Sequence, residues 1–208
     1  MKKSGCFITF EGGDGAGKST LIETIHQYLE KTGRSVLKTR APGGTRVGEI
    51  IRSLLLTKTE TPLSDRGELF LFLADRAQHV QEIIKPALDK GCIVLCDRYN
   101  DSTVAYQGTA RGFDPDWTRS LCNFATHDLQ PDLTLYLDID PKVGLSRVLR
   151  LGNDKDRIES EGLAFHEKIR KAFHKIAKQD SERFKIIDAS LSTAEVFEHA
   201  LAKINYVL

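Results

Sequence analysis

Residues 12–20, GGDGAGKST, bring together four glycines, a carboxylate, a lysine and two hydroxyl side chains. They match the pattern G-x-x-x-x-G-K-S, in which glycines let backbone N–H groups turn inward toward phosphate oxygens. In this pattern Lys18 reaches the β- and γ-phosphates, and the Ser19 hydroxyl holds Mg²⁺. A chance glycine turn is the alternative, but the apolar run before the loop and the helix-like spacing after it favour phosphate binding. The expected nucleotide-binding residues are Gly12, Gly13, Asp14, Gly15, Ala16, Gly17, Lys18, Ser19 and Thr20.

An aspartate and an arginine follow a second apolar run, CIVLC at 92–96. In parallel α/β sheets ligands gather at the carboxyl ends of strands, which is where Asp97 is expected. An acid there, across from Ser19, can position Mg²⁺ through water, and the planar fork of Arg98 suits a phosphate. We therefore assign Ser19 and Asp97 to a metal site, with a plain surface ion pair of Asp97 and Arg98 as the alternative.

Asp14 is an anion inside a loop that is built for anions. Its charge would repel a phosphate about 4 Å away by several kcal/mol in a partly dry site. Its presence is explained if a cation lies between the two, and a solvated turn aspartate is the alternative.

The elements that must position these residues can be read from apolar periodicity. Strand-like runs lie at 6–10, 35–39, 92–96, 133–138 and 184–188. Helix-spaced apolar residues lie between them, Asp140 precedes Pro141 as an N-cap precedes an N1 proline, and Pro86 is expected to kink a helix over 66–90. Strands that alternate with helices predict an α/β fold, a parallel sheet flanked by helices, in a single domain that covers 1–208.

Composition narrows the function classes. The 208 residues carry 30 basic and 29 acidic side chains, a net charge of +1, which gives no reason to expect nucleic acid or a membrane as partner. No apolar stretch has the length of a signal peptide or a membrane span, so a cytoplasmic protein is expected. The four cysteines lack zinc spacing and are expected to be buried thiols. The six histidines show no catalytic pattern.

The phosphate-binding loop alone does not choose between a kinase, a GTP switch and a motor. A switch should carry N-K-x-D, but the nearest string, NDKD at 153–156, is out of order, and a motor usually needs a longer chain. A small-molecule kinase needs an acceptor pocket and a lid, and the sequence offers candidates for both.

Four sequence motifs, which follow one another along the chain, indicate which acceptor such a kinase would bind. DRYNDSTVAYQ at 97–107 is similar to the D-R-Y-x-x-S-x-x-A-Y-Q signature of thymidylate kinases. The loop FEGGDGAGKST, TRAPGGT at 39–45 and LFLADRAQH at 71–79 agree with other strings of that family, and the match covers about 7–177. The chain therefore resembles the bacterial-type thymidylate kinases, which implies a P-loop nucleoside monophosphate kinase fold with a five-stranded parallel sheet. It also implies phosphorylation of dTMP to dTDP by ATP with Mg²⁺, and a homodimer.

The resemblance also implies roles for individual residues. Phe72 would stack on thymine and Arg76 would donate to its carbonyl edge, although periodicity alone would make Phe72 plain core. Tyr106 would pack against the sugar and disfavour a 2′-hydroxyl. The implied substrate-binding residues are Asp14, Arg52, Phe72, Arg76, Arg98, Ser102, Tyr106 and Gln107. One departure is Ala41, where the family has a glutamate; Arg40 or Arg52 must therefore be held by another group.

Gly15 is informative because some thymidylate kinases place an arginine there, whereas others supply arginine from a lid. The glycine, together with DRIE at 156–159, resembles the second type and implies a lid over about 147–161. An arginine delivered on closure stabilises the transferring phosphoryl group, and a basic solvated helix end is the alternative. The expected catalytic residues are Asp14, Lys18, Arg98, Arg147, Arg150 and Arg157. The sequence leaves open which lid arginine is the main donor.

Two rival functions remain at this stage. A deoxynucleoside kinase would accept thymidine, but two arginines placed for an acceptor phosphate argue against it. A non-catalytic nucleotide-binding module would not need the lysine, the metal-site acid and the lid arginines together.

Overall fold

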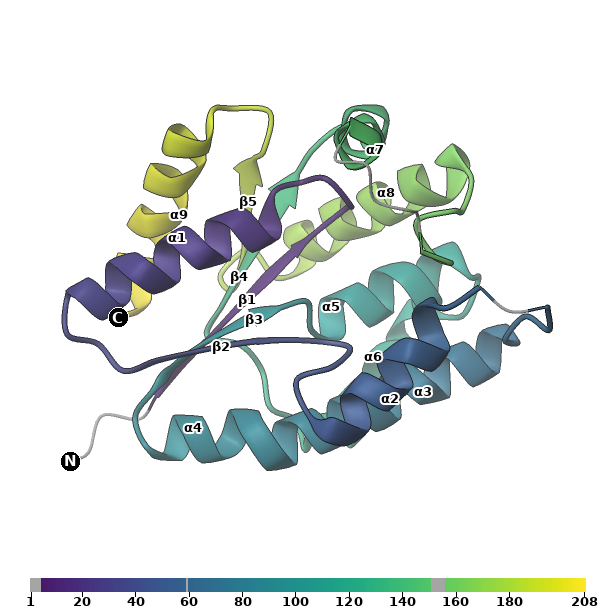
Figure 1. Ribbon diagram of the computed structural model, residues 1–208, viewed down its shortest axis with the longest axis horizontal. Helices are drawn as coiled ribbons and strands as arrows, with labels where there is room; N and C mark the ends of the chain where they lie inside the picture. The colour runs from purple at the N-terminus through teal and green to yellow at the C-terminus, as the bar shows by residue number, and fades with distance from the viewer. Residues whose placement is uncertain (1–4, 59, 151–155) are drawn as a thin grey trace.

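A computed structural model describes residues 5–58, 60–150 and 156–208 of the chain (Figure 1). The expected excursion around 151–161 is therefore described only from residue 156 onward. Within the described ranges, no helix combines the length and the apolar composition that crossing a membrane requires.

The centre of the molecule is a five-stranded sheet of parallel strands, as predicted. The strands are β1 (Cys6–Gly12), β2 (Val36–Arg40), β3 (Ile93–Asp97), β4 (Leu133–Asp138) and β5 (Phe184–Asp188), in the order β2-β3-β1-β4-β5. In the register, Phe10 of β1 lies opposite both Asp97 of β3 and Leu135 of β4. The carboxyl ends of β1 and β3 therefore meet at one edge of the sheet, where the sequence places its phosphate loop and its metal-site acid.

Helices cover both faces of the sheet. The helices are α1 (Lys18–Lys31), α2 (Arg46–Leu56), α3 (Asp65–His79), α4 (Lys85–Asp89), α5 (Asn100–Thr103), α6 (Pro115–Thr126), α7 (Pro141–Arg150), α8 (Leu163–Gln179) and α9 (Thr193–Val207). Two wide π-helical turns, η1 (Val80–Ile84) and η2 (Val104–Ala110), follow α3 and α5.

Alternation along β1 divides the core between the two faces. Ile8 and Phe10 pack with the apolar stripes of α1 and α9, whereas Phe7 packs with η1 and α4 on the other side. Figure 1 shows α1 and α9 together on one side of the sheet and α4 on the other. A third cluster, centred on Phe173 of α8, packs Tyr136 of β4 against η2. That cluster places η2 beside the carboxyl edge of the sheet.

Two of the helix predictions, the N-cap before Pro141 and the kink near Pro86, can be compared with the structure. The backbone N–H of Lys142 donates to Asp140 Oδ1 at 2.9 Å, which confirms the N-cap before Pro141. The helix predicted over 66–90 runs from Asp65 to Asp89 but widens into η1 just before Pro86. Proline lacks an N–H and its ring crowds the carbonyl four residues back, so a wide turn relieves the conflict there.

Candidate active site

The phosphate-binding loop connects β1 to α1 through left-handed backbone. Gly15 has φ +72° and Gly17, at the N-terminus of α1, has φ +90°, conformations that side chains with a Cβ rarely adopt. The buried ammonium of Lys18 donates to the carbonyls of Gly12 at 3.1 Å and Gly13 at 3.0 Å. Burial, together with the nearby Arg98 guanidinium, lowers the pKa of Lys18. Lys18 therefore lies inside its own loop.

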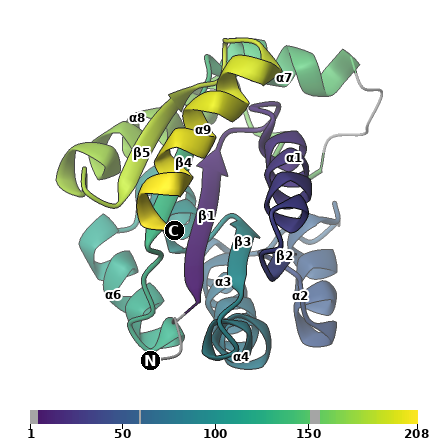
Figure 2. The ribbon, with the colours of Figure 1, turned by 90° about the vertical axis from the view of Figure 1, so that its left-hand side faces the viewer.

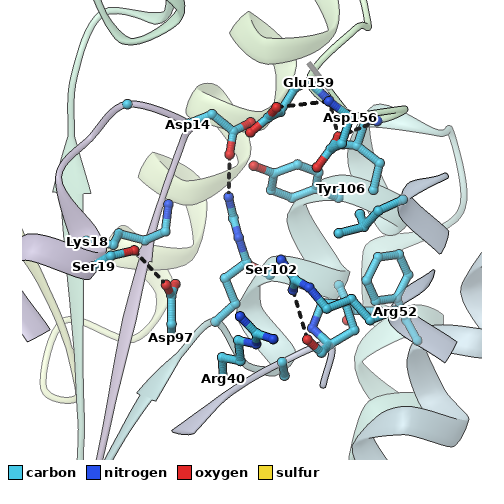
Figure 3. A pocket seen from close by; sticks show the side chains of 18 of the residues that line it. Asp14, Lys18, Ser19, Arg40, Arg52, Asp97, Ser102, Tyr106, Asp156 and Glu159 are labelled. Carbon is cyan, nitrogen blue, oxygen red and sulfur yellow. Dashed lines mark hydrogen bonds and ion pairs between the residues drawn. The ribbon is translucent and has the colours of Figure 1, made fainter. Parts of the chain in front are cut away.

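The loop opens on a cavity of about 470 Å³ at the carboxyl ends of β1, β2 and β3 (Figure 3). Its lining joins the loop to all of the residues that the resemblance assigned to the substrate. These are Asp14, Arg52, Phe72, Arg76, Arg98, Ser102, Tyr106 and Gln107, together with Lys18, Ser19 and Asp97. Side chains that are far apart in the sequence thus face one space.

Arg98 lies in the part of the cavity where the resemblance places the acceptor. Its backbone has a left-handed φ of 69°, and its guanidinium donates to Asp14 Oδ1 at 2.8 Å and to Ser102 Oγ at 3.3 Å. The guanidinium carbon lies 5.1 Å from the centre of the Tyr106 ring. The cation that Asp14 required is therefore Arg98, since the two form an ion pair (Figure 3).

Glu11 is a buried residue beside the candidate site that sequence reasoning missed. It is fully buried at the end of β1, where it accepts from the Tyr99 backbone N–H at 2.7 Å and from Ser102 Oγ at 2.5 Å. Burial and the neighbouring Asp101 raise the pKa of Glu11 to about 7. Because Ser102 donates its single proton to Glu11, its oxygen is free to accept from Arg98. A charged residue at the end of a buried strand was the sequence signal that could have revealed this role.

Ser19 and Asp97 lie together, with Ser19 Oγ 3.4 Å from Asp97 Oδ2. The other carboxylate oxygen of Asp97 is buried without a hydrogen-bond partner. A hydroxyl beside an unpartnered carboxylate oxygen is a donor set that suits a hard cation such as Mg²⁺. No larger cluster of metal-binding side chains occurs in the part of the chain that the structure describes.

The loop after β2 is held by α3 and supplies a ligand to Arg52. Asp75 accepts from the Gly43 N–H at 2.8 Å, and His79 Nε2 lies 2.7 Å from Thr39 Oγ1. Arg52 then donates to the Pro42 carbonyl at 2.9 Å.

The same region answers the question raised by Ala41. Arg40 donates to both carboxylate oxygens of Glu49, at 3.0 and 3.1 Å, so Glu49 holds this arginine. Ala41 itself is buried. Arg40 and Arg52 are thus both held by groups other than a glutamate at position 41.

The end of the cavity that the resemblance assigns to the base combines an aromatic ring with a buried cation. Phe72 and Arg76 lie one turn apart on α3, and both are buried. Arg76 donates to the Arg98 carbonyl at 3.2 Å and stacks 4.8 Å from the centre of the Tyr99 ring, while its Nε has no partner. The phenolic oxygen of Tyr106 is also buried without a partner. These unpartnered groups make the base end ready for a polar ligand.

The three candidate lid arginines lie outside the described lining of the cavity. Arg147 donates to the Gly15 carbonyl at 3.4 Å and to the Ala189 carbonyl at 3.2 Å. Arg157 donates to the Leu55 carbonyl at 2.8 Å and to Glu68 at 2.5 Å. Arg150 is exposed at the end of α7, and 151–155 lie outside the described residues.

Gly15 has a second reason to lack a side chain. A Cβ on Gly15 would lie 2.1 Å from the carbonyl oxygen of Gly144 in α7, and a Cβ on Gly144 would lie 2.4 Å from the carbonyl oxygen of Asp14. The loop and α7 therefore touch backbone to backbone, and an arginine at position 15 is excluded in this arrangement.

A parallel sheet of this order, a phosphate-binding loop and an arginine-rich second anion site facing it define a P-loop nucleoside monophosphate kinase fold. Residues 10–200 match the family model described as thymidylate kinase. The chain is 45% identical to a thymidylate kinase of Protochlamydia amoebophila, with 96% of this chain and 92% of that protein covered. It is 47% identical to one of Nitratidesulfovibrio vulgaris, with 97% of each covered. The chain belongs to the thymidylate kinase family.

A solved structure gives the same result for the fold. The crystal structure of thymidylate kinase from Ehrlichia chaffeensis superposes with a TM-score of 0.78 at 33% identity, covering 97% of this chain and 99% of that one. The prediction of family and fold from the four sequence strings is confirmed.

Proposed function

We propose that the chain phosphorylates dTMP to dTDP by direct in-line transfer of the γ-phosphoryl group of ATP. The observation that supports this proposal most strongly is the single cavity that joins Lys18 of the phosphate loop to Arg52 and Arg98. A kinase of a nucleoside monophosphate needs two anion sites facing each other, and this cavity has both. The acceptor is a phosphate oxygen that already carries charge, so no strong general base is needed.

The donor half of the cavity is assigned to the phosphates of ATP. The backbone N–H groups of 12–20 bind the phosphates, and Lys18 turns from the Gly12 and Gly13 carbonyls to the β- and γ-oxygens. Ser19 and Asp97 would hold Mg²⁺, which when bound neutralises charge on the β- and γ-phosphates.

The acceptor half is assigned to dTMP. Arg98 and Arg52 align the acceptor phosphate. The Asp14 carboxylate holds the Arg98 guanidinium and also faces the sugar. Phe72 stacks on the thymine ring, and Arg76 donates to its carbonyl edge. Ser102 and Gln107 complete the base pocket, and the buried ring of Tyr106 leaves little room for a 2′-hydroxyl.

The lid is assigned to about 147–161, with Arg147, Arg150 and Arg157 as donors to the transferring group. Arg147 already contacts the Gly15 carbonyl, so it lies next to the loop that is assigned to the phosphates. Arg157 would first have to leave Glu68. The lid also excludes water, which would otherwise hydrolyse ATP. We treat 1–208 as one catalytic domain that includes this lid, and we propose that it acts in the cytoplasm.

We also propose that the chain forms a homodimer through α2, α3 and α6. These helices lie side by side with α3 between the other two (Figure 2). They expose large apolar side chains: Val47, Ile50 and Leu54 on α2, Phe70 on α3, and Trp117 and Phe124 on α6. Apolar residues spread over three neighbouring helices form the kind of surface that a second copy covers. Sedimentation of the wild type and of Leu54→Asp tests the proposal; a wild-type monomer would exclude it.

A coupled assay of ADP release tests the reaction. With Mg·ATP we expect turnover with dTMP and none with thymidine. Turnover with thymidine alone would identify a deoxynucleoside kinase, and no turnover with any nucleoside monophosphate would indicate a binding module.

A further inference from the structure

Glu68 is a buried carboxylate of α3 that lies just behind the cavity and has no assigned role. Its side chain is 1% exposed, and four N–H groups donate to it. Oε1 accepts from Gln107 Nε2 at 2.8 Å and from Arg111 Nε at 3.2 Å. Oε2 accepts from Arg111 Nη2 at 3.2 Å and from Arg157 Nη2 at 2.5 Å. Two oxygens with two donors each are saturated.

The charge state of Glu68 follows from these contacts. Burial disfavours the carboxylate, but the hydrogen bonds from Gln107, Arg111 and Arg157 outweigh burial and hold the pKa of Glu68 below its usual range. At neutral pH the group is ionised, so it accepts hydrogen bonds and donates none.

An ionised Glu68 determines which way the Gln107 amide points. Only the NH₂ end of the amide can face an acceptor, so Nε2 is turned toward Glu68. Gln107 also lines the cavity, whereas Glu68 does not. Among the described residues no donor engages the Gln107 side-chain carbonyl oxygen, and this oxygen is not fully buried. The carbonyl oxygen is therefore the end of the amide that is open to the cavity.

An acceptor beside a donor matches one kind of pyrimidine edge. Arg76 supplies N–H donors at the same end of the cavity, and the Gln107 carbonyl supplies an acceptor. Thymine and uracil present the complement, a 4-oxo acceptor beside an N3–H donor. Cytosine presents the reverse, a 4-amino donor beside an N3 acceptor, which would leave two pairs of like groups facing each other.

We propose that Glu68 is a positioning residue for base selection, which holds the Gln107 amide so that its carbonyl oxygen selects a pyrimidine with a hydrogen on N3. The inference rests on the proposed place of Gln107 in the base pocket. Glu68 touches no substrate, and its effect on base selection passes through Gln107.

The test compares three nucleotides in wild type and in Glu68→Gln. Inhibition constants of dCMP and dUMP against dTMP phosphorylation give two selectivity ratios. A glutamine at position 68 can turn either end toward Gln107, so the orientation of Gln107 is no longer imposed. We expect the preference for dTMP over dCMP to fall about tenfold or more. The preference for dTMP over dUMP should stay unchanged, because these bases share the same N3 and 4-oxo edge. A general loss of structure would affect both preferences, so it would not lower the preference over dCMP and leave the preference over dUMP unchanged.

Two further variants complete the experiment. Glu161→Gln removes a carboxylate that accepts from the same Arg111 at 2.6 Å but does not touch Gln107, so both ratios should match wild type. Gln107→Met removes the acceptor itself and keeps the side-chain length, so it should lower the preference over dCMP even if Glu68→Gln fails to fold. In the double variant the preference should fall no further than in Gln107→Met.

The outcomes separate this inference from the proposed function. A wild type that does not phosphorylate dTMP would overturn the function. A wild type that phosphorylates dTMP, with a dCMP preference that stays within about twofold of wild type in Gln107→Met or in folded Glu68→Gln, would overturn only the role of Glu68.

Discussion

The contact between Gly15 and Gly144 makes a sharp prediction for the variant Gly15→Ala. The new Cβ would lie 2.1 Å from the Gly144 carbonyl oxygen and 2.7 Å from its carbonyl carbon, and both are backbone atoms that cannot rotate away. The loop or α7 must therefore move. The residue also has φ +72°, which an alanine adopts with strain.

The size of the effect can be worked from these two terms. The left-handed conformation costs a residue with a Cβ about 1–2 kcal/mol. Forcing two packed segments apart costs about 1–3 kcal/mol, as in overpacked cores. The sum centres on about 3.5 kcal/mol, and for a chain of this size each kcal/mol lowers Tm by about 2–4 °C. We therefore expect Tm to fall by about 7–14 °C. A loop displaced by about 1 Å should also lower kcat/KM for ATP by about 100-fold.

Two other glycines separate strain from contact. Gly33 has φ +78°, and a Cβ added there would have no atom within 4 Å, so Gly33→Ala reports strain alone, about 1–2 kcal/mol. Gly13 has neither a left-handed φ nor a neighbour within 4 Å of an added Cβ, so Gly13→Ala should leave Tm almost unchanged. Thermal unfolding followed by circular dichroism gives the three values. If Gly15→Ala unfolded at the same temperature as Gly33→Ala, the backbone contact with α7 would not exist as described.

Three further predictions concern the site. Lys18→Ala should lower kcat about 100-fold or more while dTMP binding changes little, because Lys18 acts on the donor phosphates; near-normal turnover would contradict the loop assignment. Tyr106→Phe should change discrimination against the ribonucleotide less than Tyr106→Ala, measured as the ratio of kcat/KM values, because the ring supplies the bulk; equal discrimination in both variants would contradict the steric role. Burial and Arg76 lower the pKa of His79 to about 3, so the unfolded chain takes up its proton first and stability is lost as pH falls below the unfolded value of about 6.5. Between pH 7 and pH 5, wild type should lose about 2 kcal/mol of unfolding free energy relative to His79→Gln, measured by urea titration, and parallel pH curves would contradict a neutral buried His79.

The sheet was predictable because each strand is a short apolar run bounded by polar or glycine residues. The five runs and the helix spacing between them determine a parallel sheet, and the four family strings determine where the loop and the acceptor residues lie. Within a strand, alternation sets which face a side chain joins, as Ile8 and Phe10 show against Phe7.

The side-chain partners were not predictable, because they join residues that only the fold brings together. Glu11 and Ser102 are 91 positions apart, and Glu68 and Arg157 are 89 apart. Local patterns carry no signal for such pairs. The groups that hold Arg40 and Arg52 were unknown for the same reason, since Glu49 lies in the next helix and Pro42 acts through its backbone carbonyl.

The two middle residues of the loop now have separate tasks that follow from where the loop makes contact. Asp14 points across the cavity and pairs with Arg98, which Glu11 supports through Ser102. Gly15 turns the backbone the other way, against Gly144 of α7, the helix at which the proposed lid begins. A shift of this one loop would therefore move Arg98 and α7 together, and with them the proposed acceptor site and the start of the proposed lid. These two contacts explain why an aspartate, Asp14, is followed directly by a glycine, Gly15, in the middle of the phosphate-binding loop.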